Sequence, residues 1–192
     1  MIKLMRFILP FAILTCLFAG DTVIPGQDTV LQIDPAQTTV EFVLGDVLHT
    51  VHGTFQLKRG NIRFDVVSGK AAGELVVDAA SGASGSKARD RRMNEHVLES
   101  EKYPDIVFRP DRLEGKLAMQ GPSQVQLHGM FAIHGAEHEV TLPFDVVAND
   151  GQFTATTSFL VPYVKWGMKN PSTLILRVND KVKIDIRTVA RR

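Results

Sequence analysis

The fold class follows from residues 125–146, which read VQLHGMFAIHGAEHEVTLPFDV. Apolar side chains take odd-numbered positions from Val125 to Ile133, whereas the even-numbered Gln126 and His128 are polar. After a glycine-containing turn the alternation resumes from Val140 to Val146. Side chains of a β-strand point alternately to opposite faces, so the pattern predicts two antiparallel strands, each with one buried face.

The same period of two recurs along the chain. It covers Thr38 to Leu44, Phe55 to Val66 and Leu174 to Ile186. Within the last two stretches, Lys58-Arg59-Gly60-Asn61 and Asn179-Asp180 are typical turn sequences, which predicts a hairpin at each place. Because Gly, Pro, Asn or Asp separate the runs, we expect eight to ten antiparallel strands in one sandwich or barrel.

One stretch breaks the alternation. Residues 84–100, SGSKARDRRMNEHVLES, are rich in helix formers, begin with a plausible serine cap, and space Met93 and Val97 four apart. This spacing predicts a short helix over about residues 84–99 that packs a narrow apolar stripe on the barrel. With no internal repeat or linker visible, we predict a single domain over residues 28–190.

Composition excludes several classes of protein. The 192 residues are 44% apolar and 22% charged, which is ordinary for a globular chain. The formal net charge of +1 lacks the basic surplus of a general nucleic-acid binder. A single cysteine, Cys16, excludes an intramolecular disulfide and any CxxC metal or redox motif.

The first twenty residues, Met1 to Gly20, have the layout of a secretory signal peptide. Lys3 and Arg6 give a positive start, a thirteen-residue apolar run covers Phe7 to Ala19, and small residues stand at the end. The run is shorter than the roughly 20 apolar residues of a membrane span. We therefore expect a periplasmic or secreted mature protein. An uncleaved N-terminal anchor and a lipid-modified Cys16 stay open as alternatives.

Four blocks carry a resemblance to a known family. They are a strand pair, a stretch that runs from Arg-Asp through Lys-Tyr-Pro into an aromatic strand, a hairpin, and the last strand pair. In order they are His52–Asp65, Ala88–Pro110, His128–Phe144 and Leu174–Thr188. The chain resembles the YceI-like family of exported lipid-binding proteins. The resemblance implies an all-β, antiparallel, eight-stranded, lipocalin-like barrel that takes up a polyisoprenoid, an isoprenoid quinone or a similar amphiphile, without catalysis and without a cofactor.

The expected cavity lining is the inward apolar set of the strands plus one helix residue. It comprises Phe42, Leu44, Phe55, Phe64, Leu75, Val77, Met93, Phe108, Leu127, Phe131, Ile133, Leu142, Phe144 and Phe159. Eleven phenylalanines against two tyrosines and one tryptophan suit an isoprenoid better than a sugar. An eight-stranded barrel is equally wide enough to be filled by its own side chains, so a structural or interaction module is the alternative.

Two polar segments could serve a lipid ligand. Arg89 of the Arg-Asp pair is the candidate for the lipid head group, because guanidinium gives planar two-point recognition. The alternative is a solvated helix face. Tyr163 and Trp166, in the segment Val161–Ser172, would form either an amphipathic flap that touches a membrane or a plug at one barrel end. Transient membrane contact and a homodimer are compatible with this sequence.

Catalytic and metal sites are weakly supported. His128 and His134 lie about 20 Å apart on one strand face at about 3.3 Å per residue. His134 and His138 could meet across their turn, but they lack a third ligand, so we expect surface or turn histidines and no metal. The serines of residues 81–86 lack the glycine spacing of a hydrolase elbow, which leaves a secreted hydrolase as a minor alternative.

Overall fold

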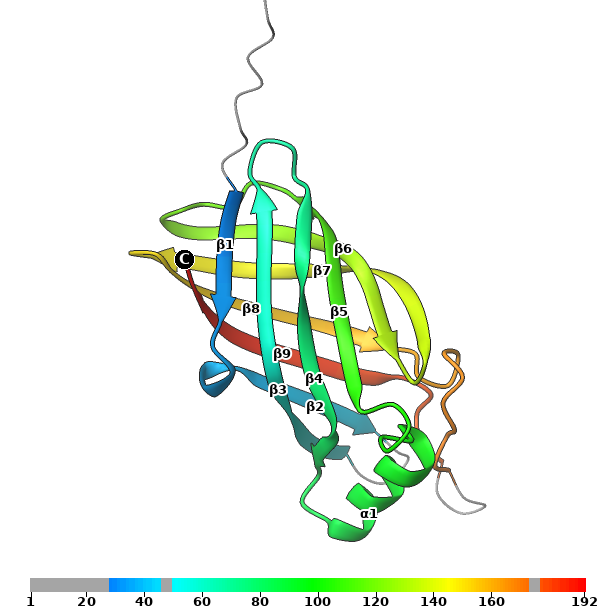
Figure 1. The fold of residues 1–192 in the computed structure, drawn as a ribbon. Helices are drawn as coiled ribbons and strands as arrows, with labels where there is room; N and C mark the ends of the chain where they lie inside the picture. The colour runs from blue at the N-terminus through cyan, green and yellow to red at the C-terminus, as the bar shows by residue number, and fades with distance from the viewer. Residues whose placement is uncertain (1–27, 46–49, 173–176) are drawn as a thin grey trace, which may run out of the picture.

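The computed structural model describes residues 28–45, 50–172 and 177–192 (Figure 1). The predicted signal peptide, Cys16 and the beginning of the last predicted strand pair lie outside the described residues. No helix in the described ranges is long and apolar enough to cross a membrane.

One sheet of nine strands contains most of the described chain. A single turn of 3₁₀ helix at Pro35–Gln37 separates the first two strands. The strands are β1 (Asp28–Ile33), β2 (Thr39–Gly45), β3 (Thr50–Asp65), β4 (Ala71–Ala83), β5 (Asp105–Glu114), β6 (Gly121–Ile133), β7 (Ala136–Asn149), β8 (Gln152–Val161) and β9 (Val182–Arg191).

The sheet closes on itself. Its order is β1-β3-β2-β9-β8-β7-β6-β5-β4, its paired strands are antiparallel, and β3 also pairs with β4. β2 pairs with the first part of β3, with Val40 opposite Phe55. β1 pairs with the last part of β3, with Thr29 opposite Phe64. β1 and β2 thus share one place in the wall, and strands β2 to β9 form an eight-stranded barrel. The predicted fold class is confirmed.

The predicted hairpin at Lys58-Arg59-Gly60-Asn61 is wrong, because β3 runs through it without a turn. β4 pairs with β3 on both sides of this stretch, and the register shifts between Leu57 and Arg59. A Cβ at Gly60 would lie 3.1 Å from the Cβ of Ile33, so the glycine lets β1 approach closely. This glycine serves packing between strands and not a chain reversal.

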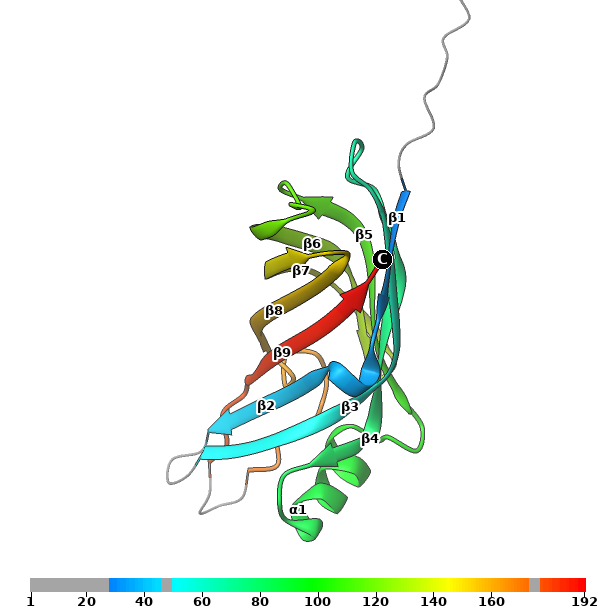
Figure 2. The ribbon, with the colours of Figure 1, turned by 90° about the vertical axis from the view of Figure 1, so that its left-hand side faces the viewer.

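The predicted helix is present with shorter ends. Helix α1 (Lys87–Arg92) continues into a π-helical turn, η2 (Met93–Val97). Both lie at one end of the barrel, and the C-terminus lies toward the other end (Figures 1 and 2). Strand β4 ends at Ala83, where the chain leaves the wall and turns across this end.

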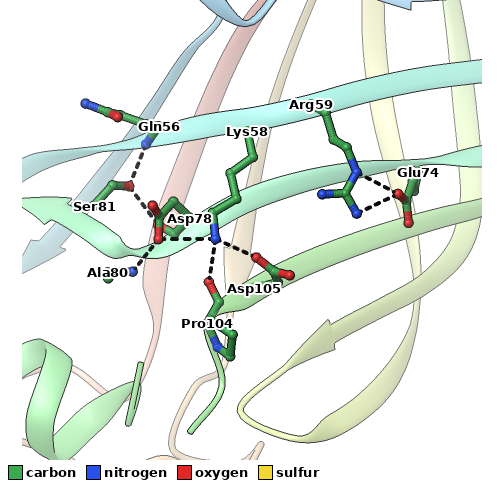
Figure 3. Close-up of polar contacts among 9 residues, drawn as sticks. All are labelled: Gln56, Lys58, Arg59, Glu74, Asp78, Ala80, Ser81, Pro104 and Asp105. Carbon is green, nitrogen blue, oxygen red and sulfur yellow. Dashed lines mark hydrogen bonds and ion pairs between the residues drawn. The ribbon is translucent and has the colours of Figure 1, made fainter. Parts of the chain in front are cut away.

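Polar groups on the outer face join β3, β4 and the segment before β5 (Figure 3). The Lys58 ammonium lies 2.7 Å from Asp105 and 3.6 Å from Asp78, and it donates a hydrogen bond to the Pro104 carbonyl. Arg59 donates to Glu74 on the neighbouring strand. These side chains are partly exposed, so solvent screens each pair and its contribution to stability is small. They link β3 to its neighbours at the place where the register between β3 and β4 shifts.

Candidate functional site

An apolar cavity of about 520 Å³ lies inside the half of the barrel nearest α1. Its wall comes from β2, β3, β4, β5, β6, β8 and β9, and its end is covered by α1, η2 and the chain between β8 and β9. The strand residues that line it are Val40, Phe42, Leu44, Val51, Phe55, Val77, Ile106, Phe131, Ile133, Phe159, Val161, Val182, Ile184 and Ile186. The size is typical of a site for a small apolar ligand.

The structure divides the sequence-predicted lining into two groups. One group faces the cavity: Phe42, Leu44, Phe55, Val77, Met93, Phe131, Ile133 and Phe159. The other group packs against the remaining core instead and does not line the cavity: Phe64, Leu75, Phe108, Leu127, Leu142 and Phe144. The side chains of both groups lie on the inner face of the barrel. Alternation identifies the inward face of a strand but not the depth along the barrel axis, which separates the two groups.

Sequence reasoning left out one whole side of the cavity. Val161 of β8, together with Val182, Ile184 and Ile186 of β9, lines it. The period of two in the last strand was visible in the sequence and was the available signal. These four aliphatic side chains make the cavity less aromatic than the expected lining.

The segment between β8 and β9 covers the end of the cavity. Tyr163 and Met168 line it and are 5% and 3% exposed, and the Tyr163 hydroxyl donates to the Asn179 carbonyl at 2.7 Å. Burial raises the pKa of Tyr163 to about 12. The Trp166 ring lies 5.7 Å from that of Phe131 and stacks on His138 at 4.1 Å. Of the two interpretations left open by the sequence, the packing corresponds to a plug.

The Arg-Asp pair of α1 holds the helix to the end of β4. Asp90 accepts hydrogen bonds from the backbone N–H of Ser84, at 2.8 Å, and from its hydroxyl. Arg89 donates from Nε to the Ser84 hydroxyl at 2.7 Å and from Nη2 to the Ser84 carbonyl at 2.6 Å. We call this arrangement the Ser84 clasp. Ser84 and Arg89 also line the cavity, so the head-group candidate Arg89 lies at its rim.

The histidines lie in different surroundings. His128 stands on the outer face between Asp111 and Glu139, and His134 lies 3.7 Å from Glu99. Burial lowers the pKa of His138, whose Nε2 has no hydrogen-bond partner among the described residues. In the same part of the chain, no three His, Cys, Asp or Glu side chains are grouped so that they could hold a metal ion.

A larger depression of about 900 Å³ crosses the outside of β6 to β9 and β2. Exposed polar side chains such as Gln124, Asp145, Ser158 and Arg187 border it, and it is more open to solvent than the inner cavity. Enclosure and an apolar lining, both needed to bury a ligand, occur in the inner cavity, which we therefore take as the candidate site.

Solved structures share this barrel. BcnA of Burkholderia cenocepacia is 19% identical, with a TM-score of 0.67 over 82% of this chain and 98% of that chain. A polyisoprenoid binding domain from Saccharophagus degradans, implicated in plant cell wall breakdown, is 16% identical, with a TM-score of 0.67 over 84% and 97%. The YceI protein of Campylobacter jejuni is 16% identical, with a TM-score of 0.57 over 69% and 80%.

No curated protein matches the sequence. The family model of the YceI-like domain matches residues 31–190, which include all but the first three residues of β1 and the last of β9. All four blocks that carry the resemblance in the sequence fall inside this range. The chain therefore belongs to the YceI-like domain family.

Proposed function

We propose that this protein binds an amphiphilic lipid, a polyisoprenoid, an isoprenoid quinone or a similar molecule, with its tail in the inner cavity. The observation that carries the proposal is a cavity of about 520 Å³ inside the barrel with a wall of aliphatic and aromatic side chains. Burying a tail there gains about 0.8 kcal/mol per CH₂ before the cost of ordering the ligand. The name of the Saccharophagus domain supports the isoprenoid class.

The cavity also separates this proposal from the alternatives. A barrel used as a structural module would be filled by its own side chains, as its other half is. A hydrolase needs a nucleophile, a base and an oxyanion site that converge. Among the described residues, the polar lining consists of Ser84, Ser86, Tyr163 and two arginines, without a carboxylate or an imidazole. Binding without catalysis is therefore the function that this lining favours.

Export is part of the proposal. The layout of Met1–Gly20 supports delivery to the periplasm or the cell exterior, where a barrel with an enclosed apolar site shields a lipid tail from water. Transient membrane contact and a homodimer stay predictions of the sequence.

A matched pair of variants tests lipid binding. Ile184→Asp places a charge in the cavity wall, whereas Leu160→Asp makes a similar change on the outer face of the adjacent strand, where Leu160 is 59% exposed. Each protein is purified after export, extracted with organic solvent and analysed by mass spectrometry. We expect a stoichiometric lipid with the wild type and with Leu160→Asp. We expect none with Ile184→Asp, because a charge is costly to bury against an apolar tail.

Circular dichroism shows whether Ile184→Asp is folded. Equal lipid content in folded Ile184→Asp and in the wild type would place the ligand elsewhere. A wild type that carries no lipid and also takes up no added isoprenoid would contradict the proposed function.

A further inference from the structure

The cavity ends blindly halfway along the barrel. Ile106 of β5 lines it, but Phe108, the next inward residue of that strand, is 6% exposed and lies outside the lining. Leu127 and Leu142 face each other on β6 and β7 and are likewise buried beyond the cavity. At the far end Phe153 is 2% exposed. A tail that enters from the α1 end therefore meets a packed floor.

The volume limits the tail that fits above this floor. A methylene group is close in size to a water molecule, whose share of liquid volume is about 30 Å³. At that size a cavity of about 520 Å³ holds about 17 such groups when it is completely filled. This corresponds to roughly three isoprene units or to one ordinary fatty acyl chain. One such chain fills a cavity of this volume.

The charges at the rim have one sign. Among the described residues that line the cavity, Arg89 and Arg92 are the two charged ones, and both belong to α1. No acidic side chain lines the cavity in that part of the protein. An apolar cavity with two guanidinium groups at its rim is complementary to an amphiphile whose head is anionic, since guanidinium binds carboxylate and phosphate with paired hydrogen bonds.

The two arginines have different partners. Arg89 already uses Nε and Nη2 in the Ser84 clasp, so it positions the helix. Arg92 makes no hydrogen bond or ion pair with any described residue and is exposed at the rim. Within the described part of the chain, the donors of its guanidinium are therefore available to a ligand. Arg91, the next residue, is also exposed but does not line the cavity.

We infer that the cavity takes one single-chain amphiphile with an anionic head and a tail of about 15 to 17 carbons, and that Arg92 binds the head. This inference rests on the proposed function and narrows its ligand class. Short prenyl phosphates and fatty acids share the required chemistry. A long polyprenyl chain exceeds the space above Phe108.

Trp166 provides a direct readout, because it is the single tryptophan of the chain and its ring lies against Phe131 of the cavity wall. Delipidated protein is titrated with farnesyl phosphate, farnesol, palmitate and octaprenyl phosphate, and its fluorescence is recorded. We expect farnesyl phosphate or palmitate to bind tightest, and their comparison identifies the source of the anion. Farnesol and octaprenyl phosphate should each bind with an affinity lower than that of the tightest ligand by a factor of about ten or more.

Neighbouring arginines give a matched control for the head-group contact. Arg92→Gln should weaken binding of the tighter anionic ligand about tenfold or more, because charged hydrogen bonds are lost, and leave farnesol unchanged. Arg91→Gln removes the same charge from the same helix and should change neither affinity. If both variants behave alike, or if farnesol loses as much affinity as the anion, the assignment of Arg92 is overturned.

A second variant tests the length limit without weakening the packed half of the barrel. Val77→Phe adds a ring to the cavity wall, opposite Ile106, where the space is empty. It should shift the preferred tail from farnesyl to geranyl phosphate and shorten the preferred fatty acid. Equal affinities for farnesyl and octaprenyl phosphate in the wild type, or no shift in a folded Val77→Phe, would overturn the length limit. Failure of every lipid to bind would instead contradict the proposed function itself.

Discussion

At the scale of single residues, His128 is the side chain whose protonation the fold controls most clearly. Its Nδ1 lies 2.6 Å from Asp111 of β5 and its Nε2 lies 2.8 Å from Glu139 of β7. A neutral imidazole donates one hydrogen bond, whereas the imidazolium donates two, so both contacts together require the charged form. Hydrogen bonds to Asp111 and then to Glu139 raise the pKa of His128 above its ordinary value of 6.5.

We predict that this bridge stabilises the barrel on the acidic side of neutrality. Because the folded pKa is raised, the stabilisation is complete below the unfolded value of about 6.5 and is lost as pH rises through the folded pKa. The free energy of unfolding of the wild type minus that of His128→Gln should therefore fall as pH increases from about 6. Urea denaturation of both proteins at a series of pH values measures this difference in unfolding free energy. His96→Gln is the control, since His96 forms no ion pair with a described residue. If the difference in unfolding free energy between the wild type and His128→Gln did not change with pH, the prediction would be contradicted.

At the scale of elements, α1 depends on the Ser84 clasp. With six residues it is far below the roughly 12 to 15 that an isolated helix needs, and none of its residues is buried. We predict that Asp90→Ala increases hydrogen exchange across residues 84–97 about tenfold or more and leaves β6 and β7 unchanged. Hydrogen-exchange mass spectrometry makes the comparison. Glu95→Ala, at an exposed position of η2, should have no effect. Unchanged protection in Asp90→Ala would show that the clasp does not hold the helix.

The elements also show how far sequence reasoning reaches. Alternation from Val125 to Ile133 correctly predicted strands, since it is a local consequence of one buried face. The turn expected at Gly60 was wrong. That glycine is needed for close packing against Ile33, which is distant in the sequence, and a local pattern carries no information on such a contact. Phe108 and Phe131 are neighbours in register and both point inward, yet the cavity reaches Phe131 alone. Depth along the barrel depends on strand tilt and on how the ends are covered, so the site could be predicted by face but not by extent.

At the scale of the whole molecule, the barrel divides into a packed half that supplies stability and a hollow half that is available for a ligand. β8 crosses both, with Phe153 2% exposed at one end and Phe159 in the cavity wall at the other. Truncating one phenylalanine of β8 in each half therefore compares how much the two halves contribute to stability. Phe153→Ala should lower the free energy of unfolding by about 3–5 kcal/mol, because the ring is enclosed on all sides and leaves a new void.

Phe159→Ala should cost markedly less in the lipid-free protein, since its ring already lines the empty cavity and meets the Phe131 ring edge-on at a centroid distance of 6.2 Å. Urea denaturation of delipidated proteins tests both variants. A ligand at 100 times its dissociation constant should then stabilise the wild type and Phe153→Ala alike, by about 2.7 kcal/mol, because Phe153 is not part of the cavity wall. Equal costs for the two truncations in the lipid-free state would mean that the hollow half closes when it is empty, and the division of the barrel into two halves would then belong to the ligand-bound state alone.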